Sequence, residues 1–258
     1  MYAKMLYGKR KLYFRYAPPI TDLDGATNDR PNPPFPNSPL YCRSVFYYWW
    51  AFLQENEGYM ECCERGGTGK FSSLYRDFGD VRGKDFMKWW TKGGGNGQGG
   101  RLLFCEPEIG APTVHLSPPP TIDDEHELLV SIPITGDLER TLAELRNILQ
   151  KPMQSFRKRA KENGASSSNG HGPRYPVHAM HSLTALHQTL MTWQAKRRLP
   201  ENATLVEVGR EAANGEFPIW NANGEHMSTM SRNKVHRYLH SAERLIHNVG
   251  YGRFPDFS

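Results

Sequence analysis

The sequence predicts a predominantly helical α+β fold with two domains, and three observations carry this prediction. Residues 41–90 contain 14 of the chain's 30 aromatic residues. In the C-terminal stretch 228–249, apolar residues recur at steps of three and four, as along one face of an α-helix: Val235, Leu239, Ala242, Leu245, Ile246 and Val249. Positive charge is concentrated beyond residue 150, where 15 Lys and Arg face 8 Asp and Glu, against 17 and 19 before it.

The totals exclude several classes of protein. At 258 residues the chain is long enough for one large domain or two modest ones. No segment approaches the ~20 apolar residues that span a bilayer, and no apolar signal-peptide core follows the basic N-terminus. We therefore expect a cytoplasmic protein without a membrane partner. The four cysteines contain no CxxC pair, which favours reduced, mostly buried thiols: Cys42, Cys62, Cys63 and Cys105.

The N-terminal domain is expected to combine an aromatic helix with a few short strands. Residues 11–17 (KLYFRYA) are typical of a strand that ends at the following Pro pair. The Pro-, Asn- and Asp-rich residues 21–39 predict an extended loop. Ser44 is a suitable N-cap for a single helix over residues 45–64, stopped by the Gly pair that follows.

Shorter elements are expected beyond this helix. Residues 93–100 (GGGNGQGG) have the composition of a flexible linker. Hydrophobic periodicity and turn signals around this linker predict three helices and two strands. The helices are expected at 71–78, 84–90 and 137–150, and the strands at 101–106 and 128–134.

The aromatic residues of the segment 41–90 permit three interpretations. They can form a compact core, stack on the bases of single-stranded nucleic acid, or anchor a protein partner. Aromatic residues fall on every face of the predicted helix at 45–64, so most of them must be buried. Basic residues are not regularly interleaved with them before Arg65. These patterns favour the core, and a protein partner is a further hypothesis for this domain.

Two motifs in this half do not satisfy the requirements of a nucleotide or metal site. Residues 66–70 (GGTGK) resemble part of a phosphate-binding loop, but Glu64 stands where that loop needs Gly, and Phe71 where it needs Ser or Thr. The acidic residues at 123–127 can serve a metal-dependent nuclease, but a solvated turn before a strand is the commoner origin of such a cluster. No nucleophile–base pair accompanies them. We therefore expect neither an enzyme nor a cofactor.

A Ser-, Gly- and Asn-rich linker at 163–172 predicts the boundary between a domain at 1–162 and a helical domain at 173–258. The second domain is expected to begin with a helix over 177–198. The four histidines at 171, 178, 181 and 187, in the linker and around this helix, lack an HExxH pattern and a nearby Cys, so we expect no metal site. The helix ends in a basic cluster that is favoured there by the helix dipole even without a ligand: Lys196, Arg197 and Arg198.

Residues 204–249 resemble a bacterial helix-turn-helix unit. Residues 204–212 (TLVEVGREA) are similar to its first helix, and residues 233–239 (NKVHRYL) to the start of its recognition helix. The resemblance implies that the second helix enters the major groove of DNA with its N-terminal residues at base edges, while the first crosses the backbone. The residues that it places against DNA are Arg232, Asn233, Lys234, His236 and Arg237.

The rest of the basic face extends this candidate site. Asn233, Arg237, His240, Arg244 and His247 recur at helical spacing opposite the apolar stripe. The further candidate DNA contacts are therefore His240 and Arg244, together with Lys196, Arg197 and Arg198. The connection at 213–229 is far longer than the usual three- or four-residue turn, which indicates a hairpin wing or an inserted loop.

The sequence thus predicts a DNA-binding protein with a regulatory or assembly role, and DNA is favoured over RNA. An aromatic block followed by a basic segment is also similar to uncharacterised proteins of bacterial mobile elements, which implies a phage or plasmid setting. The alternative is a structural adaptor that holds nucleic acid non-specifically and binds a protein through its aromatic domain. A metal-dependent nuclease ranks last.

Overall fold

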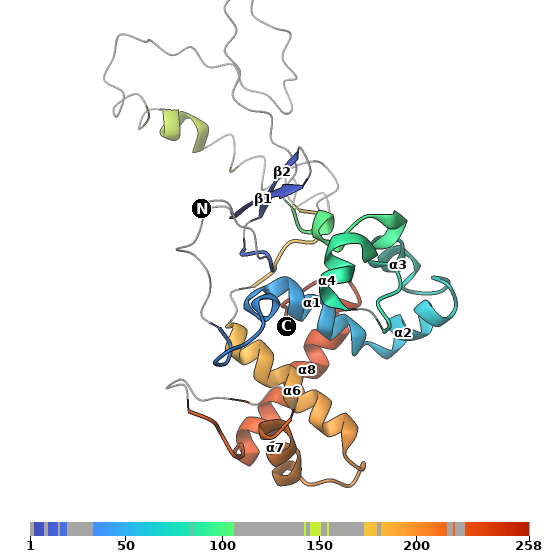
Figure 1. Cartoon of the computed structure of the whole chain (residues 1–258), viewed down its shortest axis with the longest axis vertical. Coiled ribbons are helices and arrows are strands. Elements are labelled where there is room, and N and C mark those ends of the chain that lie inside the picture. The colour runs from blue at the N-terminus through green and yellow to red at the C-terminus, as the bar shows by residue number, and fades with distance from the viewer. Residues whose placement is uncertain are drawn as a thin grey trace, which may run out of the picture. The chain divides into compact units, whose positions relative to one another are not determined.

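The computed structural model of this chain is predominantly helical (Figure 1). The residues that it describes are 3–7, 10–14, 16–19, 33–83, 85–105, 142, 145–150, 154, 173–179, 182–215, 219 and 225–257. The acidic residues at 123–127, the expected strand at 128–134 and the expected linker at 163–172 lie outside them. The chain divides into two compact units, one formed by Met1–Pro107 with Gly172–Ser258 and the other by Glu108–His171.

The described residues of the second unit belong to the helix expected at 137–150. Residues 142, 145–150 and 154 are helical. Leu142 and Ile148 are both exposed. The described part of this helix therefore turns apolar side chains to solvent.

The first unit joins residues that the sequence analysis assigns to separate domains at 1–162 and 173–258. Its main hydrophobic cluster takes Trp49 and Phe78 from the N-terminal part and Leu186 and Leu245 from the C-terminal part. One division of the chain, between His171 and Gly172, thus falls at the end of the predicted linker, whereas the other, between Pro107 and Glu108, was not predicted, and the segments on either side of these two points belong to one unit. A linker-like composition shows where regular structure is interrupted, but it does not show which segments pack together.

The N-terminus forms a hairpin of strands β1 (Ala3–Tyr7) and β2 (Arg10–Phe14), which pair antiparallel. The strand expected at 11–17 is present but ends at Phe14. Leu12 and Phe14 are two residues apart, so their side chains lie on the same face of β2, and both are buried. The ring of Phe14 lies 5.9 Å from the ring of Trp90, so the hairpin contributes to the aromatic core.

The single helix expected at 45–64 is divided into α1 (Val45–Gln54) and α2 (Glu57–Glu64). A short 3-10 helix, η2 (Leu40–Arg43), precedes α1. Ser44 caps α1 as expected, because its Oγ accepts a hydrogen bond from the backbone N–H of Phe46 at 3.3 Å.

Asn56 causes the interruption between α1 and α2. Its Oδ1 accepts a hydrogen bond from the N–H of Tyr59 at 2.9 Å and so caps α2. Its Nδ2 donates to the carbonyl of Ile246 at 2.6 Å, across 190 residues of sequence. The break depends on this distant partner as well as on the cap, and no local pattern reveals it.

Helices α3 (Ser72–Phe78) and α4 (Phe86–Lys88) lie within the helices expected at 71–78 and 84–90. A π-helical turn, η3 (Trp89–Gly93), continues α4. Two short 3-10 helices follow, η4 (Gly95–Gly97) and η5 (Gly100–Leu103). The strand expected at 101–106 is therefore wrong for its described residues, which form η5 and a turn.

The glycine-rich residues at 93–100 are packed rather than linker-like. A Cβ added to Gly95 would lie 1.8 Å from the carbonyl oxygen of Arg76, and one added to Gly99 would lie 2.4 Å from that of Thr91. Only glycine permits the backbone to approach these carbonyls so closely. The predicted flexible linker is wrong, because these glycines serve close packing and not freedom of movement.

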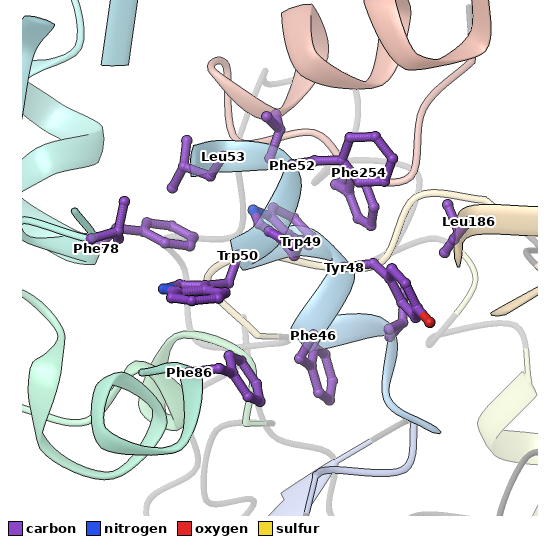
Figure 2. Packing of buried hydrophobic residues seen from close by; sticks show 14 of the residues in the cluster. Phe46, Tyr48, Trp49, Trp50, Phe52, Leu53, Phe78, Phe86, Leu186 and Phe254 are labelled. Carbon is purple, nitrogen blue, oxygen red and sulfur yellow. The ribbon is translucent and has the colours of Figure 1, made fainter. Parts of the chain in front are cut away.

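An aromatic core fills the centre of the first unit (Figure 2). Trp49, on α1, lies between rings from three other segments, with ring centroids 6.4 Å from Phe78, 5.1 Å from Phe104 and 5.5 Å from Phe254. The first of these pairs is stacked, the second is edge-on and the third is tilted, and stacked and edge-on arrangements are favoured geometries of buried aromatic pairs. The predicted aromatic core is confirmed, and these rings are not available as stacking platforms for bases.

The C-terminal helices are α6 (Leu183–Arg198), α7 (Leu205–Ala213) and α8 (Arg232–Val249). Helix α6 begins later than the expected residue 177, because Ser182 caps it. The predicted apolar stripe of α8 is confirmed: Leu239 and Ile246 are half-buried, and four residues have no exposed surface, Val235, Ala242, Leu245 and Val249. The four cysteines are free, and three are buried, also as expected.

Replacing Asn56 tests its double role. Asn56→Ala removes the cap of α2 and the bond to Ile246, and we expect it to lower the free energy of unfolding by about 2–3 kcal/mol. Asn56→Ser keeps a capping oxygen and loses only the distant bond, so it should cost about half as much. Urea denaturation measures both, and equal losses in the two variants would contradict the double role.

Excising the second unit tests the division of the chain. The N–H of Tyr175 donates to the carbonyl of Leu103 at 3.0 Å, so the chain returns beside its point of departure. Replacing residues 108–171 with a short Gly-Ser linker should therefore leave the first unit folded. We expect a cooperative thermal transition within a few degrees of that of the full chain. Loss of that transition in circular dichroism would contradict the division.

Candidate nucleic-acid interface

Helices α6, α7 and α8 are joined by a second, smaller hydrophobic cluster. It takes one residue from the end of α6, three from α7, one from α8 and two from the connection between them, all buried: Ala195, Val208, Ala212, Ala213, Ile219, Met230 and Val235. The three helices therefore share a small hydrophobic core in addition to the aromatic core.

The start of α7 is fixed by a capping box. The Oγ1 of Thr204 accepts from the N–H of Glu207 at 3.3 Å, and the Glu207 carboxylate accepts from the N–H of Thr204 at 2.7 Å. The bonds that the Glu207 carboxylate accepts from the backbone N–H and the hydroxyl of Thr204 lower the pKa of Glu207 below its ordinary value, because they favour the charged form. Their contribution to stability is present at neutral pH and is lost as the pH falls through this lowered pKa.

Gly209 on α7 lies in close contact with the start of α8. A Cβ added there would lie 3.0 Å from the carbonyl oxygen of Met230 and 3.1 Å from a methyl carbon of Val235. A buried glycine inside a helix costs about 1 kcal/mol relative to alanine, and here it allows the two helices to pack against each other. This contact brings together the two segments that resemble a helix-turn-helix.

The long connection between α7 and α8 folds back on itself. The N–H of Met227 donates to the carbonyl of Ile219 at 3.0 Å, and the Nε2 of His226 lies 3.1 Å from the carbonyl of Ala213. Ile219 and Met230 point into the small cluster. The described residues of the connection thus pack on the three helices and return the chain to the start of α8.

The first turn of α8 presents polar and basic side chains to solvent. Arg232, Asn233, Lys234 and His236 are exposed, and their side chains form no hydrogen bond or ion pair with the rest of the described chain. The side chain of Ser231 makes no capping bond, and the turn contains no acidic residue. Basic side chains at a helix N-terminus oppose the helix dipole, so this turn is electrostatically suited to a bound anion.

Arg237 lies one turn further along the same exposed face. Its guanidinium carbon is 5.5 Å from the centroid of the Tyr238 ring, and the Tyr238 hydroxyl in turn donates to Oε1 of Gln188 on α6. Because Tyr238 is held by α6, it gives the flexible Arg237 side chain a fixed surface to rest on. The guanidinium N–H groups remain available to a ligand.

The remaining predicted contacts on α8 have partners within the protein. The Nδ1 of His240 lies 3.8 Å from a carboxylate oxygen of Glu243, both exposed. The guanidinium of Arg244 donates to the carbonyl of Phe257 at 2.6 Å and so holds the C-terminal tail. Both side chains are exposed and lie on the predicted face, but Arg244 also has a structural role.

The basic cluster at the end of α6 is tied to neighbouring helices. Arg197 forms an ion pair of 2.8 Å with Glu55, whose side chain is 11% exposed, and Arg198 pairs with Glu211 at 3.2 Å. The ammonium of Lys196 donates to the carbonyl of Glu201 at 2.8 Å. These three predicted DNA contacts are therefore engaged in fixing α6 to α1, to α7 and to its own following loop.

Two residues that the sequence analysis did not include lie beside this face. Tyr251 follows α8 and is 52% exposed, with its ring centroid 5.1 Å from that of His247. The ammonium of Lys70 lies 5.0 Å from the centroid of the Tyr251 ring. The spacing of Tyr251 four residues after His247 was a usable signal, whereas nothing local to residue 70 points to α8.

The described residues contain neither a candidate metal site nor a candidate membrane span. Among them, no group of three or more His, Cys, Asp or Glu side chains is arranged to hold a metal ion. Within the same ranges, none of the helices is long and apolar enough to traverse a lipid bilayer.

Comparison with family models, curated proteins and solved structures finds no match for this chain.

Substituting Gly209 tests the contact between α7 and α8. Gly209→Val places two methyl groups against Met230 and Val235, and we expect a loss of about 1–3 kcal/mol in unfolding free energy through overpacking. The measurement is chemical denaturation, with the exposed Val206→Ala on α7 as the control. Stability unchanged from the parent would show that the helices do not pack at this position.

Proposed function

We propose that this chain binds duplex DNA with α8 as the recognition helix of a helix-turn-helix-like unit. The observation that carries the proposal is the packing of α7 on α8 at Gly209, which buries Val235 and leaves the opposite face of the first two turns of α8 exposed. A regulatory or assembly role on a bacterial mobile element or phage is part of the proposal. So is a cytoplasmic setting, which the four free cysteines support.

The side chains on α8 suit two kinds of contact. Asn233 and Arg237 are types that form paired hydrogen bonds with adenine and guanine in the major groove, respectively. Arg232 and Lys234, beside them, can neutralise phosphates, which contributes affinity and salt dependence without sequence preference. Together they combine selectivity and affinity within little more than one turn of helix.

The geometry of the nucleic acid favours DNA as the partner. The major groove of B-form DNA is about 12 Å wide and admits an α-helix. The corresponding groove of an RNA duplex is deep and narrow and does not admit one. An exposed helix with its basic face outward therefore fits DNA better than double-stranded RNA.

Arg237→Ala tests the groove contact directly. We expect it to weaken binding to a preferred duplex, selected from a random library, by ~1–3 kcal/mol and to relax the preference at one base pair. Lys234→Ala should weaken binding to all duplexes alike and lower the slope of log K against log salt by about 0.9. Fluorescence anisotropy over a salt series measures both effects.

Lys92→Ala, at an exposed lysine of η3, removes one positive charge away from α8 and is the matched control. Unchanged affinity in a folded Arg237→Ala variant would contradict the groove contact. If the unaltered protein binds selected and random-sequence duplexes equally, the adaptor with non-specific binding replaces the proposal.

A further inference from the structure

The exposed face of α8 is polar over its whole length and mostly basic, with Glu243 as its one exposed acidic residue. Asn233, Arg237, His240, Arg244 and His247 are all exposed and follow one another at steps of three and four. We call these five residues the α8 stripe. At 1.5 Å per residue, the 18 residues of α8 span about 27 Å, which is much longer than a first-turn contact requires.

The stripe does not stop at the end of the helix. Tyr251 continues it at the next step of four, with its ring beside His247. Lys70 lies over that ring, with its ammonium 5.0 Å from the Tyr251 centroid and 5.4 Å from the centroid of Phe71. Within the described chain Lys70 has no carboxylate partner, so its charge is held by aromatic faces and stays open to solvent.

The position of Lys70 relative to α8 is fixed by buried contacts. A Cβ added to Gly250, just after α8, would lie 2.9 Å from a ring carbon of Phe71 and 2.8 Å from Nδ2 of Asn56. The bond from Asn56 to the carbonyl of Ile246 joins the end of α8 to the start of α2, and Phe71 packs on α2 as well, since a Cβ added to Gly58 would lie 2.6 Å from its ring. The end of α8, the start of α2 and Phe71 are therefore packed directly against one another.

The placement of Lys70 explains the three glycines that precede it. Gly66, Gly67 and Gly69 have φ angles of 65°, 90° and 111°, which residues with side chains rarely adopt. They turn the chain sharply between α2 and α3 and place Lys70 beside the end of α8. The motif GGTGK is thus explained by the position of its lysine and not by a nucleotide.

We propose that the DNA-binding surface runs along the entire α8 stripe and continues onto Tyr251 and Lys70. In this arrangement the duplex lies along α8, with the first turn at base edges and Lys70 at a phosphate near the other end of the helix. Tyr251 packs its exposed ring against the sugar-phosphate backbone between them. At 3.4 Å per base pair the surface spans about eight base pairs. This inference rests on the proposed function.

Lys70→Ala tests the extended surface. The phosphate contact predicts a several-fold lower affinity for a 20-base-pair duplex and a slope of log K against log salt that is smaller by about 0.9. Tyr251→Ala should lower the affinity at unchanged slope, because the residue is uncharged, whereas Tyr251→Phe keeps the ring and should bind like the parent. Each variant is compared with Lys92→Ala, for which we expect the parental slope.

The outcomes separate this inference from the function on which it rests. If Lys70→Ala keeps the parental slope while Lys234→Ala reduces it, the protein binds DNA with the first turn of α8 alone, and the extended surface is wrong. If the unaltered protein fails to bind any duplex, the proposed function fails, and the extended surface fails with it. Lys70→Ala and Lys234→Ala both change exposed side chains, and circular dichroism verifies that each variant remains folded.

Discussion

One face of α8 is buried in two hydrophobic clusters at once, and the placement of the other elements depends on this burial. Val235 lies in the small cluster with α6 and α7, whereas Ala242, Leu245 and Val249 lie in the aromatic core. Burying each larger apolar side chain stabilises the fold by about 1.5–3 kcal/mol. With its inner face fixed at both ends, the helix cannot rotate, and its opposite face must point to solvent. Burial of the apolar stripe thus determines that the polar stripe on the opposite face is exposed.

The aromatic core acts as a scaffold for that helix. Its rings bury large areas, and two of their polar atoms have backbone partners inside: the indole N–H of Trp89 donates to the carbonyl of Phe78 at 2.8 Å, and the hydroxyl of Tyr59 donates to that of Gly79 at 2.7 Å. Desolvation raises the pKa of Tyr59 above its ordinary value. The segment with the most unusual composition therefore contributes rigidity, and the candidate binding surface lies on a helix of ordinary composition.

The features that could be predicted from sequence are those that depend on local periodicity and capping. The stripes of α8, the cap at Ser44 and the aromatic core follow from the order of residues within one segment. The break at Asn56, the packed glycines and the joining of both chain halves depend on contacts between distant residues. The same limit applies to the site. Arg197 is engaged by Glu55 across 142 residues, and Lys70 reaches α8 only through the fold.

The central claim is that the exposed face of α8 is where DNA binds, and amide NMR spectra of the full chain titrated with a selected duplex test it most directly. The account predicts chemical-shift changes concentrated in residues 232–251 and around Lys70, with the amides of the buried aromatic helix α1 unchanged. Changes confined to segments remote from α8, or none at saturating duplex, would contradict it.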